Sequence, residues 1–164
     1  MLRVIDISEG TSVDGPGLRT SIYFAGCVHR CEGCHNPQSW DPQAGRDATE
    51  EELLEIIKYN DFPVTLSGGD PFYNPELVAH FAKRIKNELG KNIWCYTGYK
   101  WEYIIENDRF RPLLEQIDVL VDSPFILAQR NISLRFRGSE NQRIIDVQAS
   151  LKEGKLVDIT KSFD

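Results

Sequence analysis

Long apolar runs and basic stretches are missing from this sequence, and we expect no secretory leader at its start. No run of hydrophobic residues approaches the about 20 that a membrane-spanning helix needs. No stretch is rich enough in lysine and arginine to follow a phosphate backbone, and the formal net charge is −6. The first residues, MLRVIDISEG, lack the charged and apolar regions of a secretory signal peptide. These absences argue against a membrane protein and against nucleic acid as a partner, so we expect a cytoplasmic protein.

Internal repeats, low-complexity segments and long linkers are also absent. The chain has 164 residues, of which 41% are hydrophobic and 27% are charged. This length and composition are typical of one globular domain that buries its own hydrophobic core. We therefore expect a single domain over residues 1–164.

Cysteine is scarce and unevenly distributed. Only four cysteines are present. Thiols stay reduced in the cytoplasm, so cysteines there indicate metal or redox ligands before they indicate disulfides. Cys27, Cys31 and Cys34 lie together in the stretch GCVHRCEGCHNP, whereas Cys95 lies far along the chain. The stretch with three cysteines is the first candidate for a functional site.

Strand and helix signals alternate along the chain. Thr49 and Glu52 form a capping box before a helical apolar stripe. Asn74 and Pro75 mark the start of a longer helix, and Gly90 marks its end. Strands are expected at 18–24, 63–66, 92–96, 117–121 and 134–137, and helices at 50–59, at 75–89, from about 99, and at 113–116.

This alternation predicts an α/β fold. Strands separated by helices form βαβ units with a mainly parallel sheet. A complete eight-unit barrel takes about 250 residues, so this chain has room for roughly four to five units. We therefore expect an incomplete, open βα barrel with one side left uncovered.

Four unusual stretches follow the first four expected strands. They are the cysteine loop, SGGDP, YTGY and VDSP. The carboxyl ends of parallel strands meet at one edge of a sheet, where functional residues gather. The sequence therefore predicts one functional site at that edge, with Asp70 and Asp122 as its acidic residues.

The cysteine loop offers three thiolates with the spacing C-x3-C-x2-C. One short loop of this kind suits three corners of a cubane iron–sulfur cluster, whose fourth iron would be open to a small molecule. The alternative is a structural zinc ion, completed by His29, His35 or Cys95, in an interaction module with no catalysis. Cys95 lies in the middle of an expected strand, where a cysteine is most often a small buried hydrophobic residue.

The cysteine spacing resembles the signature of radical S-adenosylmethionine (SAM) enzymes. The resemblance implies an incomplete βα barrel of the radical SAM type, with a [4Fe–4S] cluster on Cys27, Cys31 and Cys34 and with SAM bound to the open iron. The stretch SGGD resembles the family's second motif, which binds the methionine ammonium group. Its glycines allow close backbone approach, and its acidic side chain can pair with an amine. The residues that the resemblance assigns to the cofactor are Gly33, Cys34, His35, Ser67, Gly68, Gly69, Asp70 and Thr97.

Further stretches narrow the family. DGPGLRT followed by GC resembles the opening of glycyl-radical-enzyme activases. Four stretches are similar to the activases that act on anaerobic ribonucleoside-triphosphate reductase, namely GCVHRCEGCHNP, LSGGDP, WCYTGYKWEY and RGSENQRIID. The resemblance covers residues 12–146. Two positions depart from the pattern: Gly33 stands where many radical SAM loops carry an aromatic residue, and Ser123 stands where these activases often carry glycine.

The resemblance also implies a reaction and protein partners. A one-electron donor, such as a flavodoxin-type protein, would reduce the cluster, and SAM would be cleaved to methionine and a 5′-deoxyadenosyl radical. That radical would take a hydrogen atom from a glycine of the large anaerobic ribonucleoside-triphosphate reductase subunit. This step needs no acid–base side chain, so no catalytic residue is assigned beyond the cluster and the cofactor. We expect the rim, including 135–143, to dock the reductase. The alternatives are an activase of another glycyl radical enzyme and a small radical SAM enzyme that acts on a free metabolite.

Overall fold

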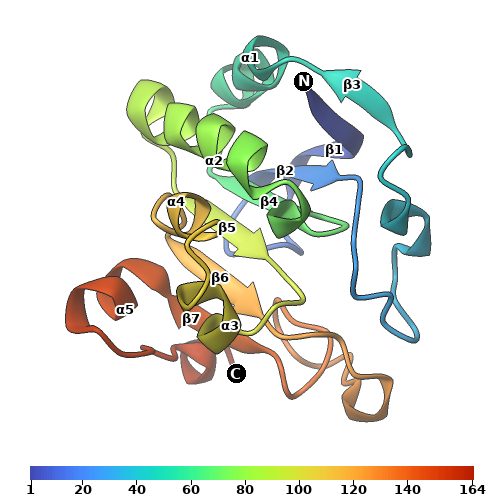
Figure 1. Cartoon of the computed structure of the whole chain (residues 1–164), viewed down its shortest axis with the longest axis vertical. Coiled ribbons are helices and arrows are strands. Elements are labelled where there is room, and N and C mark those ends of the chain that lie inside the picture. The colour runs from blue at the N-terminus through green and yellow to red at the C-terminus, as the bar shows by residue number, and fades with distance from the viewer.

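The computed structural model describes residues 1–164, and seven strands join in one sheet with the order β3-β1-β2-β4-β5-β6-β7 (Figure 1). The strands are β1 (Leu2–Thr11), β2 (Arg19–Phe24), β3 (Arg46–Ala48), β4 (Val64–Gly68), β5 (Ile93–Tyr96), β6 (Val119–Asp122) and β7 (Arg143–Asp146). The α-helices are α1 (Glu50–Asn60), α2 (Pro75–Arg84), α3 (Trp101–Ile105), α4 (Arg111–Leu114) and α5 (Val147–Glu153). Short 3-10 turns lie at Pro37–Trp40, Pro71–Tyr73, Leu127–Gln129 and Thr160–Phe163, and a π-helical turn spans Ile85–Leu89.

The middle of the sheet is parallel and its edges are antiparallel. β2, β4, β5 and β6 pair in parallel, whereas β1 pairs antiparallel with β2 and β3, and β7 pairs antiparallel with β6. The predicted α/β class is confirmed, and the predicted parallel pairing is confirmed for these four middle strands but is wrong at both edges. No strand was predicted at β1, although its two buried residues, Leu2 and Val4, lie at alternate positions of the sequence.

The two long helices begin and end close to where the sequence predicts. The Thr49 side chain accepts a hydrogen bond from the backbone nitrogen of Glu52 at 3.1 Å, which caps the first turn of α1. α2 begins at Pro75, although the Asn74 side chain makes no capping bond. The π-helical turn continues α2 to Gly90, whose left-handed conformation ends it.

The main hydrophobic core lies between the helices and one face of the sheet. Buried side chains from α1 to α5 share this core with alternate strand residues such as Ile93 and Cys95 of β5. Trp94, between them, points to the opposite face and packs in a smaller cluster with Val121 and Ile144. The helices therefore cover one face of the sheet, and loops and the C-terminal segment cover part of the other.

The strand predicted at 134–137 is wrong. This segment is irregular, and Phe136 has a φ of 66°, which no extended strand allows. The Tyr96 hydroxyl donates a hydrogen bond to the Phe136 carbonyl at 2.7 Å, and the Phe136 ring packs edge-on against Trp94. The Phe136 ring thus packs against the sheet, but the segment adds no strand to it.

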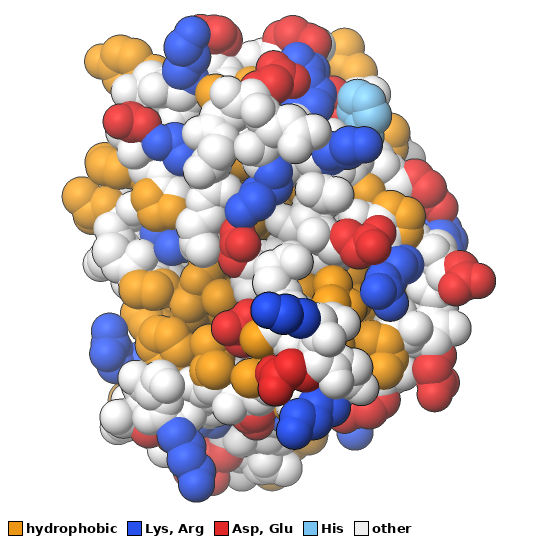
Figure 2. Space-filling model, turned by 90° about the vertical axis from the view of Figure 1, so that its left-hand side faces the viewer, with side chains coloured by type: hydrophobic (Ala, Val, Ile, Leu, Met, Phe, Trp, Pro, Cys, Tyr) orange, Lys and Arg blue, Asp and Glu red, His pale blue; other side chains and the backbone are white.

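No helix of the structure combines the length and the apolar character that crossing a membrane requires. On the face shown in Figure 2, acidic and basic side chains are interspersed, and no large area carries one sign of charge. Hydrophobic side chains gather in the lower half of that face, at the height of β6, β7 and α5 in Figure 1.

Candidate functional site

The four stretches singled out in the sequence meet at one cleft. They follow β2, β4, β5 and β6, the parallel strands, and they line a cavity of about 470 Å³ at the carboxyl edge of the sheet. Of the predicted site residues, those that line this cavity are Cys27, Cys31, Cys34, His35, Ser67, Gly68, Gly69 and Thr97. Gly33 and Asp70 do not line it. The predicted meeting of the four stretches at one edge of the sheet is confirmed, and the functional roles of their residues stay predictions.

The three cysteines of the loop are half-buried free thiols. Burial raises the pKa of the Cys27 thiol to about 11, and it also raises the pKa of Cys31. These thiols are therefore protonated at neutral pH without a metal, and a bound metal would displace the protons. The backbone nitrogen of Asn36 donates a hydrogen bond to the Cys34 sulfur at 3.4 Å. Cysteine thiolates are the ligands that iron–sulfur clusters take, and this cleft offers three unbridged thiols.

The residues considered as completing a zinc site lie elsewhere or have other partners. Cys95 is fully buried in the main core, so its predicted role as a small buried hydrophobic residue is confirmed. The His29 ring is held by Asp70, and the His35 ring packs against Phe125 with their ring centroids 5.7 Å apart. No three His, Cys, Asp or Glu side chains of the structure converge as a ligand set for one metal ion.

The two glycines after β4 lie against the base of the cysteine loop. The backbone nitrogen of Gly69 donates to the Phe24 carbonyl at 2.7 Å, and that of Asp70 donates to the Gly26 carbonyl at 2.8 Å. A Cβ on Gly69 would lie 2.4 Å from the Gly26 oxygen, and one on Gly68 would lie 2.2 Å from the Phe24 nitrogen. Only glycine fits at either position, because the neighbouring atoms are backbone. The glycine pair thus joins the second motif directly to the first.

Asp70 lies beneath the cleft with its carboxylate fully engaged. It is 2% exposed, and its oxygens accept hydrogen bonds from the backbone nitrogens of Phe72 and Gly98 and from the Thr97 hydroxyl. Its Oδ2 also lies 2.7 Å from Nε2 of His29. The predicted pairing of Asp70 with a cofactor amine stays a prediction, and it would have to compete with these four donors.

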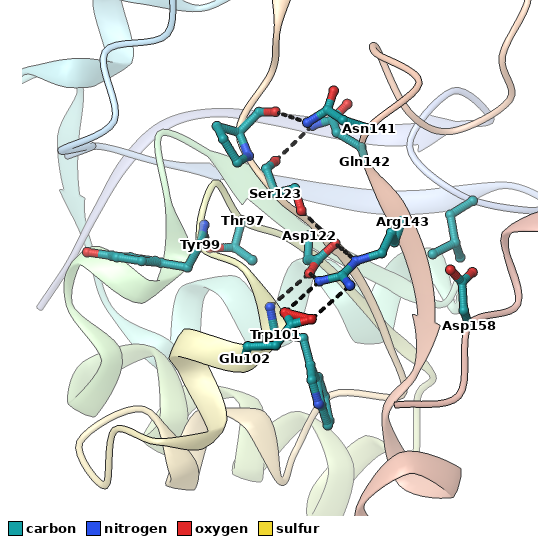
Figure 3. A network of polar contacts seen from close by, with 12 residues as sticks. Thr97, Tyr99, Trp101, Glu102, Asp122, Ser123, Asn141, Gln142, Arg143 and Asp158 are labelled. Atoms are coloured by element: carbon teal, nitrogen blue, oxygen red, sulfur yellow. Dashed lines mark hydrogen bonds and ion pairs between the residues drawn. The ribbon is translucent and has the colours of Figure 1, made fainter. Parts of the chain in front are cut away.

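Asp122, at the end of β6, is the second buried carboxylate on this edge (Figure 3). It accepts from the backbone nitrogen of Trp101 at 2.8 Å and from the Arg143 guanidinium at 2.6 and 3.1 Å. Arg143 also forms a two-pronged pair with Glu102 at 2.8 and 2.9 Å, and this pair lowers the pKa of Glu102 to about 2. The network ties β6, β7 and α3 together below the cleft.

Comparison with known proteins identifies the family. Residues 13–145 match the family model described as a 4Fe-4S single cluster domain. The chain is 39% identical to the anaerobic ribonucleoside-triphosphate reductase-activating protein of Haemophilus influenzae. The alignment spans 141 residues and covers 80% of this chain and 90% of that protein. The activating protein of Escherichia coli K12 is 37% identical over 139 residues, covering 79% of this chain and 89% of that protein. That of bacteriophage T4 is 33% identical over 141 residues, covering 80% and 86%.

The chain belongs to the family of anaerobic ribonucleoside-triphosphate reductase-activating proteins. The resemblance stated from the motifs is therefore confirmed at the level of the family. The match to a 4Fe-4S domain supports an iron–sulfur cluster, and the thiols lining the cleft supply suitable ligands.

Both departures from the activating-protein motifs have a local explanation. Gly33 has a φ of 78°, and a Cβ there would lie 2.8 Å from Leu127 and 3.3 Å from Phe125. Phe125 lines the cleft, so an aromatic ring stands next to Gly33 although none is attached to it. Ser123 has a φ of 79°, in the region that favours glycine. Its backbone is held by the Gln142 side chain, whose Nε2 donates to the Ser123 carbonyl at 3.2 Å (Figure 3).

Two arginines of the expected docking rim, Arg137 and Arg143, form ion pairs within the fold. Arg143 pairs with Asp122 and Glu102, and the Arg137 side chain, only 6% exposed, pairs with Asp164. Reductase docking at 135–143 stays a prediction, and these two side chains are not its exposed charges.

Sequence reasoning missed cleft residues that come from irregular loops. They include Val13, Asn36, Phe125, Leu134, Phe136, Arg137 and Gln142. Asn36 carried a usable signal, since it lies within the cysteine stretch GCVHRCEGCHNP. The others lie on segments without periodic pattern, and only the fold brings them to the cleft.

Proposed function

We propose that this chain is a radical SAM activase that generates a glycyl radical on anaerobic ribonucleoside-triphosphate reductase. One observation carries the proposal: the three cysteines of the C-x3-C-x2-C loop line the same cavity as Ser67, Gly68 and Gly69. Its volume of about 470 Å³ is within the range of sites that bind small molecules and cofactors. The relatives that bear the reductase-activating name match along most of their own length, which supports the same assignment.

In this proposal the chain holds two cofactors side by side. Cys27, Cys31 and Cys34 are the three protein ligands of a [4Fe–4S] cluster that has one open iron, and SAM occupies the rest of the cleft. When bound, the two cofactors would supply a reductive cleavage of SAM, in which one electron from the external donor breaks the S–C5′ bond and methionine leaves with the formation of a 5′-deoxyadenosyl radical. The protein's part is to bind and orient them. The proposed cofactor-binding residues are Gly33, Cys34, His35, Ser67, Gly68, Gly69, Asp70 and Thr97.

The proposed architecture is the incomplete βα barrel of radical SAM enzymes, in a single domain. The sheet supports this because β3 and β7 are its two edges and do not pair with each other. An uncovered side gives a glycine of the large reductase subunit a path to the cleft. We propose a flavodoxin-type one-electron donor as the second partner. We place the protein in the cytoplasm, because four free cysteines remain reduced there.

The test is the formation of the glycyl radical itself. The chain is reconstituted anaerobically with iron and sulfide, then mixed with SAM, a chemical reductant and the large reductase subunit, and the radical is measured by electron paramagnetic resonance (EPR). We expect a glycyl radical signal with the wild type and with Cys95→Ala, the matched control. We expect none with Cys27→Ala, Cys31→Ala or Cys34→Ala.

Three results would redirect the proposal. A radical formed only on a different glycyl radical enzyme would make the chain an activase of that enzyme. SAM consumption that needs no protein partner would indicate a free metabolite as substrate. A chain that binds zinc and never assembles a cluster would be a zinc-stabilised interaction module.

A further inference from the structure

The Asp70 carboxylate connects three segments that the chain keeps far apart. Its partners are His29 in the cysteine loop, Thr97 and Gly98 after β5, and Phe72 in its own turn. All five contacts are between 2.7 and 3.0 Å. Because Asp70 itself lies outside the cavity lining, its influence on the cleft passes through these partners.

His29 fits closely between its neighbours. Its Nε2 faces Asp70, and its ring packs edge-on against Tyr99 with the centroids 4.5 Å apart. A Cβ on Gly98 would lie 2.4 Å from the His29 ring, so the ring occupies the space that a side chain at position 98 would need. His29 lies between Cys27 and Cys31 in the chain, so fixing this ring fixes the segment that carries both thiols.

The opposite wall of the cleft is fixed by the same carboxylate. The Thr97 hydroxyl donates to Asp70 and accepts a hydrogen bond from the backbone nitrogen of Tyr99 at 3.1 Å. The Gly98 nitrogen donates to the Asp70 Oδ2 that also faces His29. Thr97, Gly98 and His29 all line the cavity. One buried carboxylate therefore bridges the cysteine loop and the turn after β5.

We propose that Asp70 is a positioning residue that acts through His29 and Thr97, holding the cysteine loop in register with the cofactor-lining turn. This inference rests on the proposed function for the identity of the cofactors. For Asp70 it replaces the direct contact with SAM that the resemblance implies, because it makes His29 necessary for the effect of Asp70. Groups that orient a metal ligand from behind typically change affinity or activity by about 10- to 100-fold when they are removed.

The first experiment compares SAM binding in single and double variants. The reduced, reconstituted protein is titrated with SAM, and the change in the cluster EPR spectrum gives the half-saturating concentration. We expect Asp70→Asn and His29→Gln each to raise it by about tenfold or more, and the double variant to stay within about twofold of Asp70→Asn, since both changes break one link. We expect Thr97→Val, which removes the hydroxyl that donates to Asp70, to raise the half-saturating concentration more than Thr97→Ser, which keeps it.

Matched controls separate positioning from a general loss of stability. Asp118→Asn changes a carboxylate before β6 that pairs with Lys86 and accepts from the Ile93 nitrogen. His80→Gln changes an exposed histidine that pairs with Glu50. Neither residue lines the cleft, and we expect each to change the half-saturating concentration by less than about twofold.

A second measurement needs no cofactor. In the iron-free protein, amide hydrogen exchange reports the opening of the loop and of the turn. We expect Asp70→Asn to speed exchange both at Gly98 and over residues 27–34, and His29→Gln to speed it over 27–34 alone. Should Asp70→Asn fail to fold, His29→Gln and the Thr97 pair still test the link.

The outcomes distinguish this inference from the function on which it rests. If the wild type assembles no cluster or shows no spectral change with SAM, the proposed function fails. If the wild type responds but His29→Gln binds SAM like the wild type while Asp70→Asn does not, Asp70 acts directly and the positioning role is overturned. The positioning role would also be overturned if the double variant raised the half-saturating concentration by the product of the two single effects. Unchanged amide exchange over residues 27–34 in Asp70→Asn would overturn it as well.

Discussion

Asp70 and Asp122 occupy similar places and have different partners. Each follows or ends a parallel strand at the same edge of the sheet, each is buried, and each accepts a hydrogen bond from the backbone of a neighbouring turn. Asp122 is matched by the permanent cation of Arg143 on β7. Asp70 is matched by His29, in the loop that carries the cysteines. Asp122 thus holds strands of the fold together, whereas Asp70 contacts the loop that carries the proposed cluster ligands.

The largest expected effect comes from removing the cation of Asp122. Arg143→Met leaves Asp122 buried without its charge partner, and we expect the free energy of unfolding to fall by about 2–4 kcal/mol. This is below the usual cost of breaking a fully buried pair because the guanidinium is partly exposed. Urea unfolding measures it. The double variant Asp122→Asn with Arg143→Met is expected to recover part of the loss, and a single variant as stable as the wild type would contradict the assignment.

Near Asp70, we expect the stability of the fold to depend on the close backbone contact between Gly69 and Gly26. Gly69→Ala places a Cβ 2.4 Å from the Gly26 oxygen, and we expect it to cost about 1–3 kcal/mol. Gly154→Ala is the control, since no atom lies within 4 Å of its added Cβ, although its positive φ adds a smaller strain. Chemical denaturation compares the two. Equal losses in both variants would show that the contact with the cysteine loop contributes nothing.

Substitutions of Ser123 measure the backbone strain of the turn next to Asp122. Its φ of 79° is costly for any residue with a Cβ, and its hydroxyl bonds to Asp122 at 3.1 Å. Ser123→Gly and Ser123→Ala both remove the hydroxyl, but only glycine relieves the strain. We expect the glycine variant to be more stable than the alanine variant by about 1 kcal/mol in thermal or urea unfolding. An alanine variant of equal stability would mean that the turn carries no strain.

The smallest expected effect is the pH dependence of the Glu102 pair. Arg143 lowers the pKa of Glu102 from 4.5 to about 2 in the folded state. The stabilisation is therefore fully present above pH 4.5 and is lost as the pH falls toward 2. Glu102 is mostly exposed, so solvent screening keeps the contribution below about 1 kcal/mol. Stability measured against pH should fall less steeply over this window in Glu102→Gln, and parallel curves would contradict the pairing.

The sequence predicted the cleft better than it predicted the sheet. The four stretches at the carboxyl edge follow strands whose β-branched and apolar patterns are clear, and parallel topology then requires them to meet. β3 and β7 were missed because they are short, and the apolar segment 134–137 was mistaken for a strand because periodicity cannot show that Phe136 turns left-handed. The link between His29 and Asp70 was also missed. The two residues are 41 positions apart, and only the fold brings them together.

The most direct test of the account is the EPR spectrum of the reduced, anaerobically reconstituted protein with and without SAM. The account predicts a [4Fe–4S]⁺ signal from the wild type that changes shape when SAM is added, and no such cluster in Cys27→Ala, Cys31→Ala or Cys34→Ala. A cluster spectrum that SAM leaves unchanged would contradict the open iron, and a chain that holds one zinc ion and no cluster would contradict the site as a whole.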